Sequence, residues 1–117
     1  MGIMLLTPHV VQVIRPAVTR DAATNAASRD YDAQPRREIE CNFQRRSGRI
    51  MAGAEGRFYS EDAALYTLDA EIGVDDLVIV DIAGTKGQFI VASAQSKYAT
   101  DGELRHIEVS LTKEATR

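Results

Sequence analysis

The chain has 117 residues, 44% of them hydrophobic and 26% charged, which suits a single domain spanning residues 1–117 with one modest core. It has no tryptophan and one cysteine, Cys41, so an intrachain disulfide and a cysteine-built metal site are excluded. Few rings are available for stacking on bases or sugars. The net charge of -3 is uneven, because residues 1–58 carry nine basic and six acidic side chains, whereas residues 59–117 carry five and eleven.

Residues 1–8 form an N-terminal extension before the first structural signal. The apolar run Met1–Leu6 is too short for the core of a secretion signal and has no basic region before it. No stretch approaches the length needed to cross a bilayer. We therefore expect no membrane contact and synthesis in the cytoplasm.

The first strand signal is the β-branched run His9–Arg15, which Pro16 ends. The next segment, residues 17–36, is rich in Ala, Asp, Asn, Ser and Arg, and its only large side chains with apolar character are Val18 and Tyr31. Because no face of this segment offers enough apolar surface to bury, it is predicted to be a projecting arm without regular structure. An alanine-rich helix is the competing interpretation.

Strict alternation of polar and apolar residues marks the strand Glu38–Gln44, with Ile39, Cys41 and Phe43 on one face. Further strands are predicted at Asp62–Leu68, Leu77–Val80, Gln88–Ala92 and Leu104–Thr112, with turns between them. Six short strands without an amphipathic helix predict an all-β fold, a small antiparallel β-barrel with long projecting loops. A sandwich of two sheets is the related alternative.

A second candidate for a working loop is the glycine-punctuated segment 45–57. It contains Arg45, Arg46, Arg49 and Arg57 and is predicted to be a flexible basic loop. Arginines on such a loop can meet DNA phosphates without reading sequence. They can equally meet acidic protein surfaces or remain solvated.

No pattern for chemistry is found. His9 and His106 lie in predicted strands without metal-ligand spacing, and Asp75, Asp76 and Asp81 do not match a calcium loop. The segment Gly84-Thr85-Lys86-Gly87 lacks P-loop spacing and is read as a hairpin turn. Cys41 is predicted to face the core, where a reactive thiolate is disfavoured. We therefore predict no catalytic residue, no metal and no cofactor, and a protein that is not an enzyme.

The order of the elements carries a resemblance. The segments concerned are Val11–Pro16, the arm with Asp21 and Asn25, Ile39–Arg45, Gly56-Arg57 before the strand Ala63–Leu68, Gly73–Val78, Gly87–Val91 and His106–Leu111. In order and spacing they resemble the tailed-phage head-tail joining family, also called head closure or stopper proteins. The resemblance covers nearly the whole domain. The alanine-rich arm and the Thr85-Lys86 turn depart from the usual pattern.

The resemblance implies a structural subunit of the virion neck that forms a homo-oligomeric ring between the portal or its adaptor and the tail. Such a ring retains packaged double-stranded DNA and passes it on without reading its sequence. The arm would contact a neighbouring subunit or the adaptor, and segment 45–57 would face the channel or an adjacent ring. The candidate arm contacts are Arg20, Asp21, Asn25, Arg29, Tyr31, Arg36 and Arg37.

Two other functions compete with this one. The first is a tail-terminator or tail-completion ring subunit, which would occupy the tail. The second is a nucleic-acid-binding barrel of the OB or SH3-like kind, favoured by the arginines and disfavoured by the scarcity of aromatic residues and the acidic second half.

Overall fold

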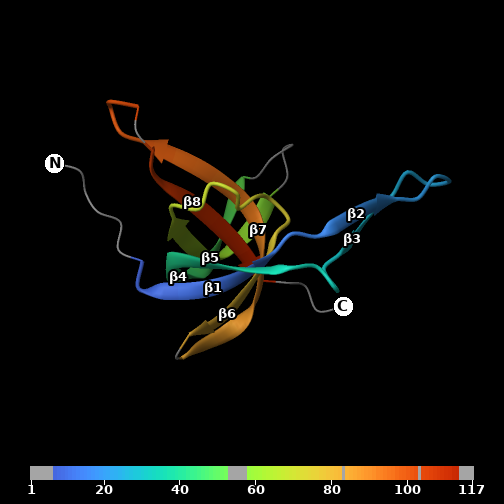
Figure 1. Cartoon of the computed structure of the whole chain (residues 1–117), viewed down its shortest axis with the longest axis horizontal. Coiled ribbons are helices and arrows are strands. Elements are labelled where there is room, and N and C mark those ends of the chain that lie inside the picture. Colours follow the sequence, from blue (N-terminus) through green and yellow to red (C-terminus); the bar gives the residue numbers. More distant parts are fainter. Residues whose placement is uncertain (1–6, 53–57, 83, 103, 114–117) are drawn as a thin grey trace.

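The structure is a closed antiparallel barrel of six strands from which a separate two-stranded hairpin projects (Figure 1). The computed structural model describes residues 7–52, 58–82, 84–102 and 104–113. The strands are β1 (His9–Ile14), β2 (Ala17–Arg20), β3 (Ala27–Asp30), β4 (Arg36–Ala52), β5 (Phe58–Thr67), β6 (Leu77–Ile82), β7 (Thr85–Tyr98) and β8 (Leu104–Lys113). The described segments contain no helix. The predicted all-β fold and its six barrel strands are confirmed.

Around the barrel the strand order is β1-β4-β5-β8-β7-β6, and β6 pairs back to β1. Each barrel strand is therefore hydrogen-bonded to a neighbour on both sides, so the closed part of the barrel has no free sheet edge to attract other strands. Three pairs of consecutive barrel strands form hairpins: β4–β5, β6–β7 and β7–β8. Ile82 pairs with Thr85 across the β6–β7 turn, and Tyr98 pairs with Leu104 across the β7–β8 turn. The β7–β8 turn was predicted at residues 100–103. The β6–β7 turn was predicted at residues 84–87, but Thr85, Lys86 and Gly87 already pair with β6 as the start of β7, because backbone pairing continues almost to the end of the hairpin.

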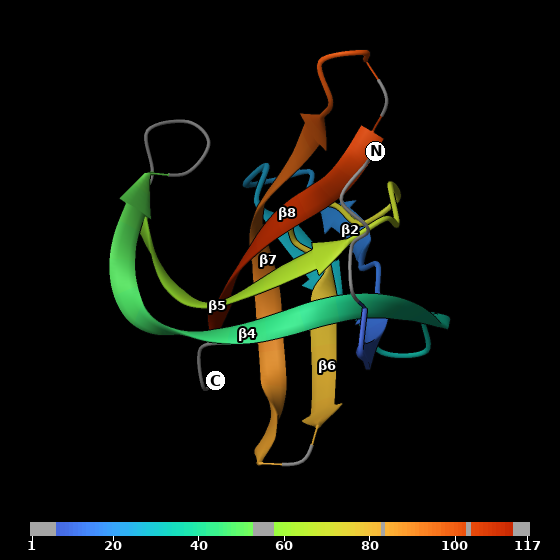
Figure 2. The ribbon, with the colours of Figure 1, turned by 90° about the vertical axis from the view of Figure 1, so that its left-hand side faces the viewer.

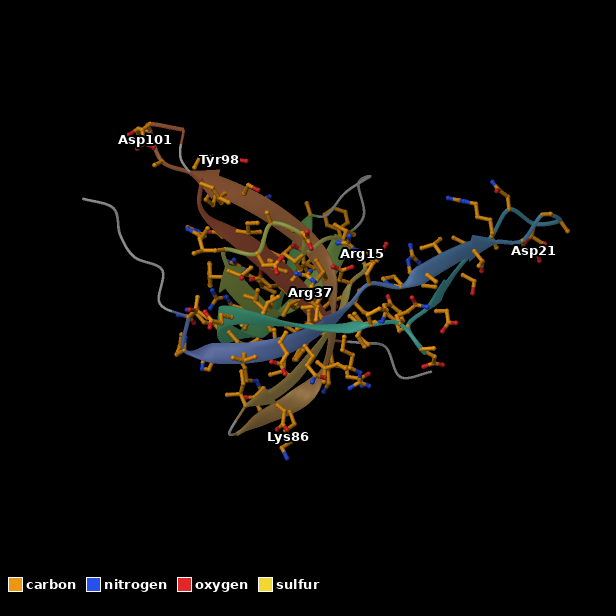
Figure 3. All side chains as sticks on the ribbon, in the orientation of Figure 1. Arg15, Asp21, Arg37, Lys86, Tyr98 and Asp101 are labelled. Carbon is orange, nitrogen blue, oxygen red and sulfur yellow. The ribbon has the colours of Figure 1, made fainter. Side chains whose placement is uncertain are left out.

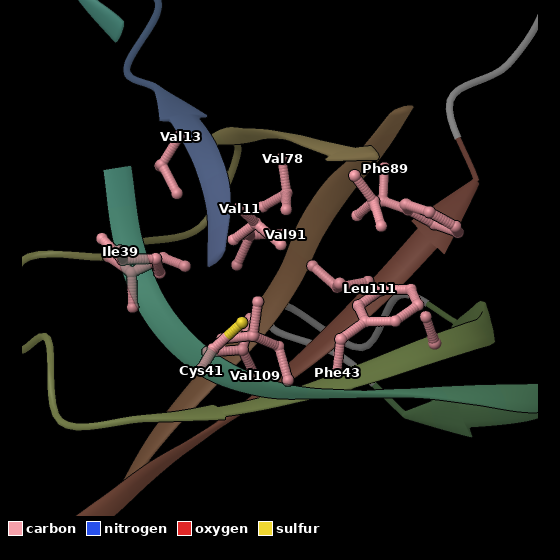
Figure 4. Packing of buried hydrophobic residues seen from close by; sticks show 14 of the residues in the cluster. Val11, Val13, Ile39, Cys41, Phe43, Val78, Phe89, Val91, Val109 and Leu111 are labelled. Carbon is pink, nitrogen blue, oxygen red and sulfur yellow. The ribbon is translucent and has the colours of Figure 1, made fainter. Parts of the chain in front are cut away.

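The core is made by alternate side chains of the barrel strands (Figure 4). Ile39, Cys41 and Phe43 point inward from β4, as their spacing predicted, and the rings of Phe43 and Phe89 lie 5.6 Å apart between centroids. The buried cluster consists of Val11, Val13, Ile39, Cys41, Phe43, Ala63, Leu65, Ile72, Val78, Val80, Phe89, Val91, Ile107, Val109 and Leu111. Because each large member contributes about 1.5–3 kcal/mol by leaving water, this cluster is the main source of stability.

Strands β4 and β5 run past the barrel as a curved hairpin (Figure 2). Their pairing continues from Arg49–Glu61 to Ala52–Phe58 after a register shift between Arg45 and Arg49. The prediction of a flexible basic loop over 45–57 is therefore wrong for residues 45–52, which belong to β4, and residues 53–57 lie outside the described residues. Backbone pairing, which needs no apolar pattern, extends the strand through this polar segment.

The arm also has regular structure. Ala17 pairs with Asp30 and Arg20 with Ala27, so β2 and β3 form a hairpin that projects from the barrel (Figure 1). The projection is confirmed, but the prediction of an irregular segment and the alternative of a helix are both wrong. Asp21 stabilises the turn, because its side chain accepts the Ala23 N–H at 2.7 Å and its carbonyl accepts the Asn25 N–H at 2.7 Å.

Candidate functional site

Most of the predicted contact residues lie in two regions of the structure. One is the arm, and the other is the end of the barrel where the β4 bulge lies beside the β6–β7 turn. All residues of the arm hairpin, 17–30, are exposed. Arg20 and Asp21 lie at its tip, where Figure 3 labels Asp21. Arg20 donates to the Asn25 carbonyl at 3.3 Å. The hairpin is therefore not buried against the barrel along its length.

The root of the arm is held by the turn between β5 and β6. Tyr31 Oη donates to the Asp75 carbonyl at 2.7 Å, and Arg29 Nη2 lies 2.9 Å from Asp75 Oδ2. The predicted contact residues Arg29 and Tyr31 thus act within the chain, where they tie the far end of β3 to the barrel.

Two further arginines complete this attachment, and Figure 3 shows both near the base of the arm. Arg15 donates to the Glu71 carbonyl and pairs with Asp76, whose side chain also accepts the Gly73 N–H at 3.0 Å. Arg37 pairs with Asp69. Since Asp76 is only 1% exposed, this attachment is partly shielded from water, so the arm has a firm base and a free end.

Arg36 and Arg37 were assigned to the arm but lie in β4 of the barrel, where they pair with Ile14 and Val13 of β1. Arg36 Nη1 donates to Gln12 Oε1 at 3.2 Å. The arm proper therefore ends before Arg36.

Arg46 and Arg49 converge on a buried carboxylate that sequence reasoning missed. Glu61 is 4% exposed, and its Oε1 lies 3.7 Å from Arg46 Nε and 3.4 Å from Arg49 Nη2. Its Oε2 accepts the Ser110 hydroxyl at 2.6 Å. Arg46 also donates to the Tyr66 hydroxyl at 2.8 Å. These two arginines are therefore committed to holding the curved β4–β5 hairpin against β8.

Glu61 could have been found from its position two residues before Ala63 and Leu65, both core residues of β5. This spacing predicts burial for Glu61, and a buried charge needs a partner of opposite charge. The partners lie on the face opposite the core, because Glu61 meets Ser110, whose two neighbours in β8 both belong to the core. The predicted strand began at Asp62, and so Glu61 fell outside it.

The bulge in β4 depends on Gly48, which has a φ of +78°. A Cβ at this position would lie 3.2 Å from Ser60 Oγ and 3.3 Å from Asp62 Oδ1. Ser60 Oγ itself donates to the Gly48 carbonyl at 3.0 Å. The bulge begins directly after Arg45 and takes in Arg46, and it therefore helps to set the direction in which β4 presents the two arginines.

Gly48→Ala is expected to lower the free energy of unfolding by about 2 kcal/mol, because it combines a left-handed backbone with a crowded Cβ. Gly84→Ala is the matched control: Gly84 has a φ of +83° and nothing within 4 Å of its Cβ position. The control should lose only the conformational part, about 1 kcal/mol. Chemical denaturation of both variants measures the difference, and equal losses would contradict the crowding at Gly48.

The β4 bulge, the β6–β7 turn and the end of β8 surround a hollow of about 380 Å³, here called the basic hollow. It is lined by Arg45–Gly48, Asp62, Gly84–Phe89 and Lys113. The hollow therefore unites Arg45 with Gly84 and the start of β7, two parts of the chain that lie far apart in the sequence. Figure 3 labels Lys86, which lies near the start of β7 beside the β6–β7 turn.

Among the described arginines of segment 45–57, only Arg45 has a side chain with no ion pair or hydrogen bond to another described residue. Arg46 and Arg49 serve Glu61, and Arg57 lies outside the described residues. The candidate contact surface is thus the basic hollow, with Arg45 as its β4 contribution.

The described residues contain no group of His, Cys, Asp or Glu side chains suited to hold a metal ion. Each of the three aspartates considered for calcium forms an ion pair with a basic side chain instead. Asp75 pairs with Arg29, Asp76 with Arg15 and Asp81 with Lys86. None of the described segments is a helix that could span a membrane.

Burial raises the pKa of the Cys41 thiol to about 11. We expect no reaction of the folded chain with a colorimetric disulfide reagent at about pH 8, and full reaction in denaturant. Because the pKa of this thiol is higher in the folded chain than in the unfolded chain, the unfolded chain loses the proton first as pH rises. The free energy of unfolding therefore falls as pH rises towards 11. Cys41→Ala should remove that part of the pH dependence. Rapid labelling of the folded chain would contradict the buried position.

No protein-family model matches the chain, and no curated protein matches it either. The inference of function therefore rests on the sequence pattern and on the geometry described above.

Proposed function

We propose that this chain is a head-tail connector subunit, of the head closure or stopper kind, in a tailed phage or phage-like particle. Copies would form a ring between the portal or adaptor and the tail, and the ring would retain double-stranded DNA and pass it on. The proposal is supported by a closed barrel that serves as a rigid scaffold, with hairpins that extend beyond it. It assigns the chain a structural role without catalysis.

The arm carries this proposal. An isolated two-stranded hairpin is marginally stable in water, yet β2 and β3 project with all of residues 17–30 exposed. Both outer edges of this hairpin offer backbone groups to another chain. The firm root directs the arm away from its own barrel. A neighbouring subunit, which would cover the arm and order it further, is the partner that this arrangement suits.

The end of the β4–β5 hairpin offers apolar surface for such an assembly. Ile50 is 69% exposed and Phe58 is 74% exposed, and the pairs Ile50–Ser60 and Ala52–Phe58 place the two side chains on the same face. Large apolar side chains exposed together commonly mark protein interfaces. This face is a second place for contact with a neighbouring subunit or ring.

Cryo-electron microscopy of particles that contain the chain tests the proposal. The expected result is a symmetric ring between portal and tail, with each arm lying on an adjacent subunit or on the adaptor. A ring at the tail end would instead select the tail-terminator or tail-completion function. Absence of the chain from the particle would reject both.

The basic hollow favours one different class of function, a nucleic-acid-binding barrel that acts alone. This alternative predicts salt-sensitive DNA binding by a chain that remains monomeric at all concentrations. Size-exclusion chromatography with light scattering, run alongside DNA titration, separates it from the ring subunit.

A further inference from the structure

The strongest unassigned feature is the basic hollow, whose walls come from four parts of the chain. Arg45 pairs with Ala63 of β5, and Lys113 pairs with Phe89 of β7. The Lys113 N–H also donates to Asp62 Oδ2 at 2.7 Å. Backbone bonds thus hold the ends of β4, β5, β7 and β8 around the hollow, so its cationic side chains start from fixed positions.

The charges in the hollow are predominantly positive. Arg45, Arg46, Lys86 and Lys113 line it, and Asp62 is its one acidic lining residue within the described chain. Asp62 Oδ2 already accepts the Lys113 N–H, and Oδ1 lies 3.1 Å from the Ser60 hydroxyl, which shares its one proton between Oδ1 and the Gly48 carbonyl. Asp62 therefore offsets part of the charge but leaves the basic side chains free to meet an external anion.

Three of the cations are available to a ligand. Within the described residues, neither Arg45 nor the Lys113 ammonium has an ion-pair partner. Lys86 has one, but weakly: its Nζ lies 3.7 Å from Asp81 Oδ1, and both side chains are at least three-quarters exposed. Exposed pairs of this kind contribute little and exchange readily. Arg46 is excluded, because it serves Glu61 and Tyr66.

The shape of the hollow indicates the class of anion. Its volume of about 380 Å³ accommodates a phosphate group with part of its attached sugars. Gly84 has open space around it, so a ligand can approach the backbone of the turn. The one ring in the wall, Phe89, is 7% exposed and cannot stack on a base. Charge without a stacking platform suits the backbone of a duplex rather than a single strand.

We propose that the basic hollow binds the phosphodiester backbone of double-stranded DNA through Arg45, Lys86 and Lys113. The site reads no sequence, because backbone contacts carry no base information. The inference deepens the proposed connector function by naming where the ring subunit touches DNA, and it takes the choice of DNA as ligand from that function.

The test is fluorescence anisotropy of a short labelled duplex titrated with the full chain and with Arg45→Gln, Lys86→Gln and Lys113→Gln. Each substitution is expected to weaken binding about threefold at moderate salt and to make the slope of log affinity against log salt shallower by about 0.9. The triple variant should lose about thirtyfold. These side chains are exposed, and the Lys113 bond to Asp62 comes from its backbone, so the strands stay paired.

Lys97→Gln is the matched control. Like Lys86→Gln, it removes one positive charge from β7, but at the opposite end of that strand, where Lys97 Nζ lies 3.9 Å from Glu108 Oε2. It should leave affinity and salt slope unchanged. Equal weakening by Lys97→Gln, or no duplex binding by the unmodified chain at low salt, would overturn the proposal.

Inorganic phosphate, followed by chemical shifts of the labelled chain, distinguishes the source of the phosphate. Chemical-shift changes in the hollow residues together with duplex binding support a site for the DNA backbone. The same changes without duplex binding would assign the hollow to free phosphate and overturn the DNA assignment.

The connector proposal can fail independently of this inference. A chain that binds duplex DNA but forms no neck ring contradicts only the connector proposal. A neck ring without hollow-dependent binding contradicts only this inference.

Discussion

Replacing Arg46 by leucine is expected to lower the free energy of unfolding by about 3 kcal/mol. The substitution removes one of two cations beside the buried Glu61 carboxylate and also the donor to the Tyr66 hydroxyl. Glu61 Oε1 already lacks a hydrogen-bond partner, so it depends on the charge of the two arginines. Chemical denaturation followed by circular dichroism measures the loss.

Arg49→Leu is the control for this prediction. Its side chain is 64% exposed and makes one contact with Glu61, so its loss should cost less than about 1 kcal/mol. The double variant Arg46→Leu and Glu61→Leu should recover much of the stability that Arg46→Leu loses, since no buried carboxylate is then left without the more buried of its two arginine partners. Equal costs for the two single variants would show that Arg46 has no special role in the cluster.

The Glu61 cluster also has a structural purpose. Ser110 of β8 and the two arginines of β4 meet at this carboxylate, at the point where the β4–β5 hairpin bends away from the barrel. Several groups must be satisfied together there, which fixes one direction for the hairpin. Weakening the cluster is therefore expected to loosen the exposed Ile50 and Phe58 surface as well as to lower stability.

The barrel strands could be predicted because their burial leaves a period of two in the sequence. Ile39, Cys41 and Phe43 show it on β4, and Ile107, Val109 and Leu111 show it on β8. Where strands leave the barrel this signal ends. The segment Ser47-Gly48-Arg49 reads as a loop, although its backbone continues in a strand with a bulge.

The candidate site was predictable only in part, because it depends on closure of the barrel. Arg45 was recognised as a basic residue, but nothing local places it beside Lys86 and Lys113. That proximity comes from pairing of β7 with β8 and of β4 with β5, which are contacts between distant parts of the chain. The same holds for the arm root, where Arg15, Arg29 and Arg37 meet acids of a later turn.

Removing the arm is expected to abolish assembly while leaving the barrel folded. Ala17 and Asp30 are paired partners, so residues 18–29 can be replaced by Asn-Gly, a sequence that joins two antiparallel strands in a tight turn. Because all of the removed residues are exposed, the thermal midpoint should change little. The Arg29–Asp75 pair is the one root contact that is lost, and it is half exposed.

Assembly of this variant is best compared with the intact chain by light scattering at matched concentrations, with portal or adaptor rings present as templates. A chain lacking the arm that still joins a ring would show that the arm is not the contact between subunits, and would shift attention to Ile50 and Phe58 on the β4–β5 hairpin. If Ile50→Ser and Phe58→Ser then abolish assembly while the arm deletion does not, the ring is built from the curved hairpin. If both changes weaken it, the two surfaces act together, as a ring subunit with one neighbour on each side requires.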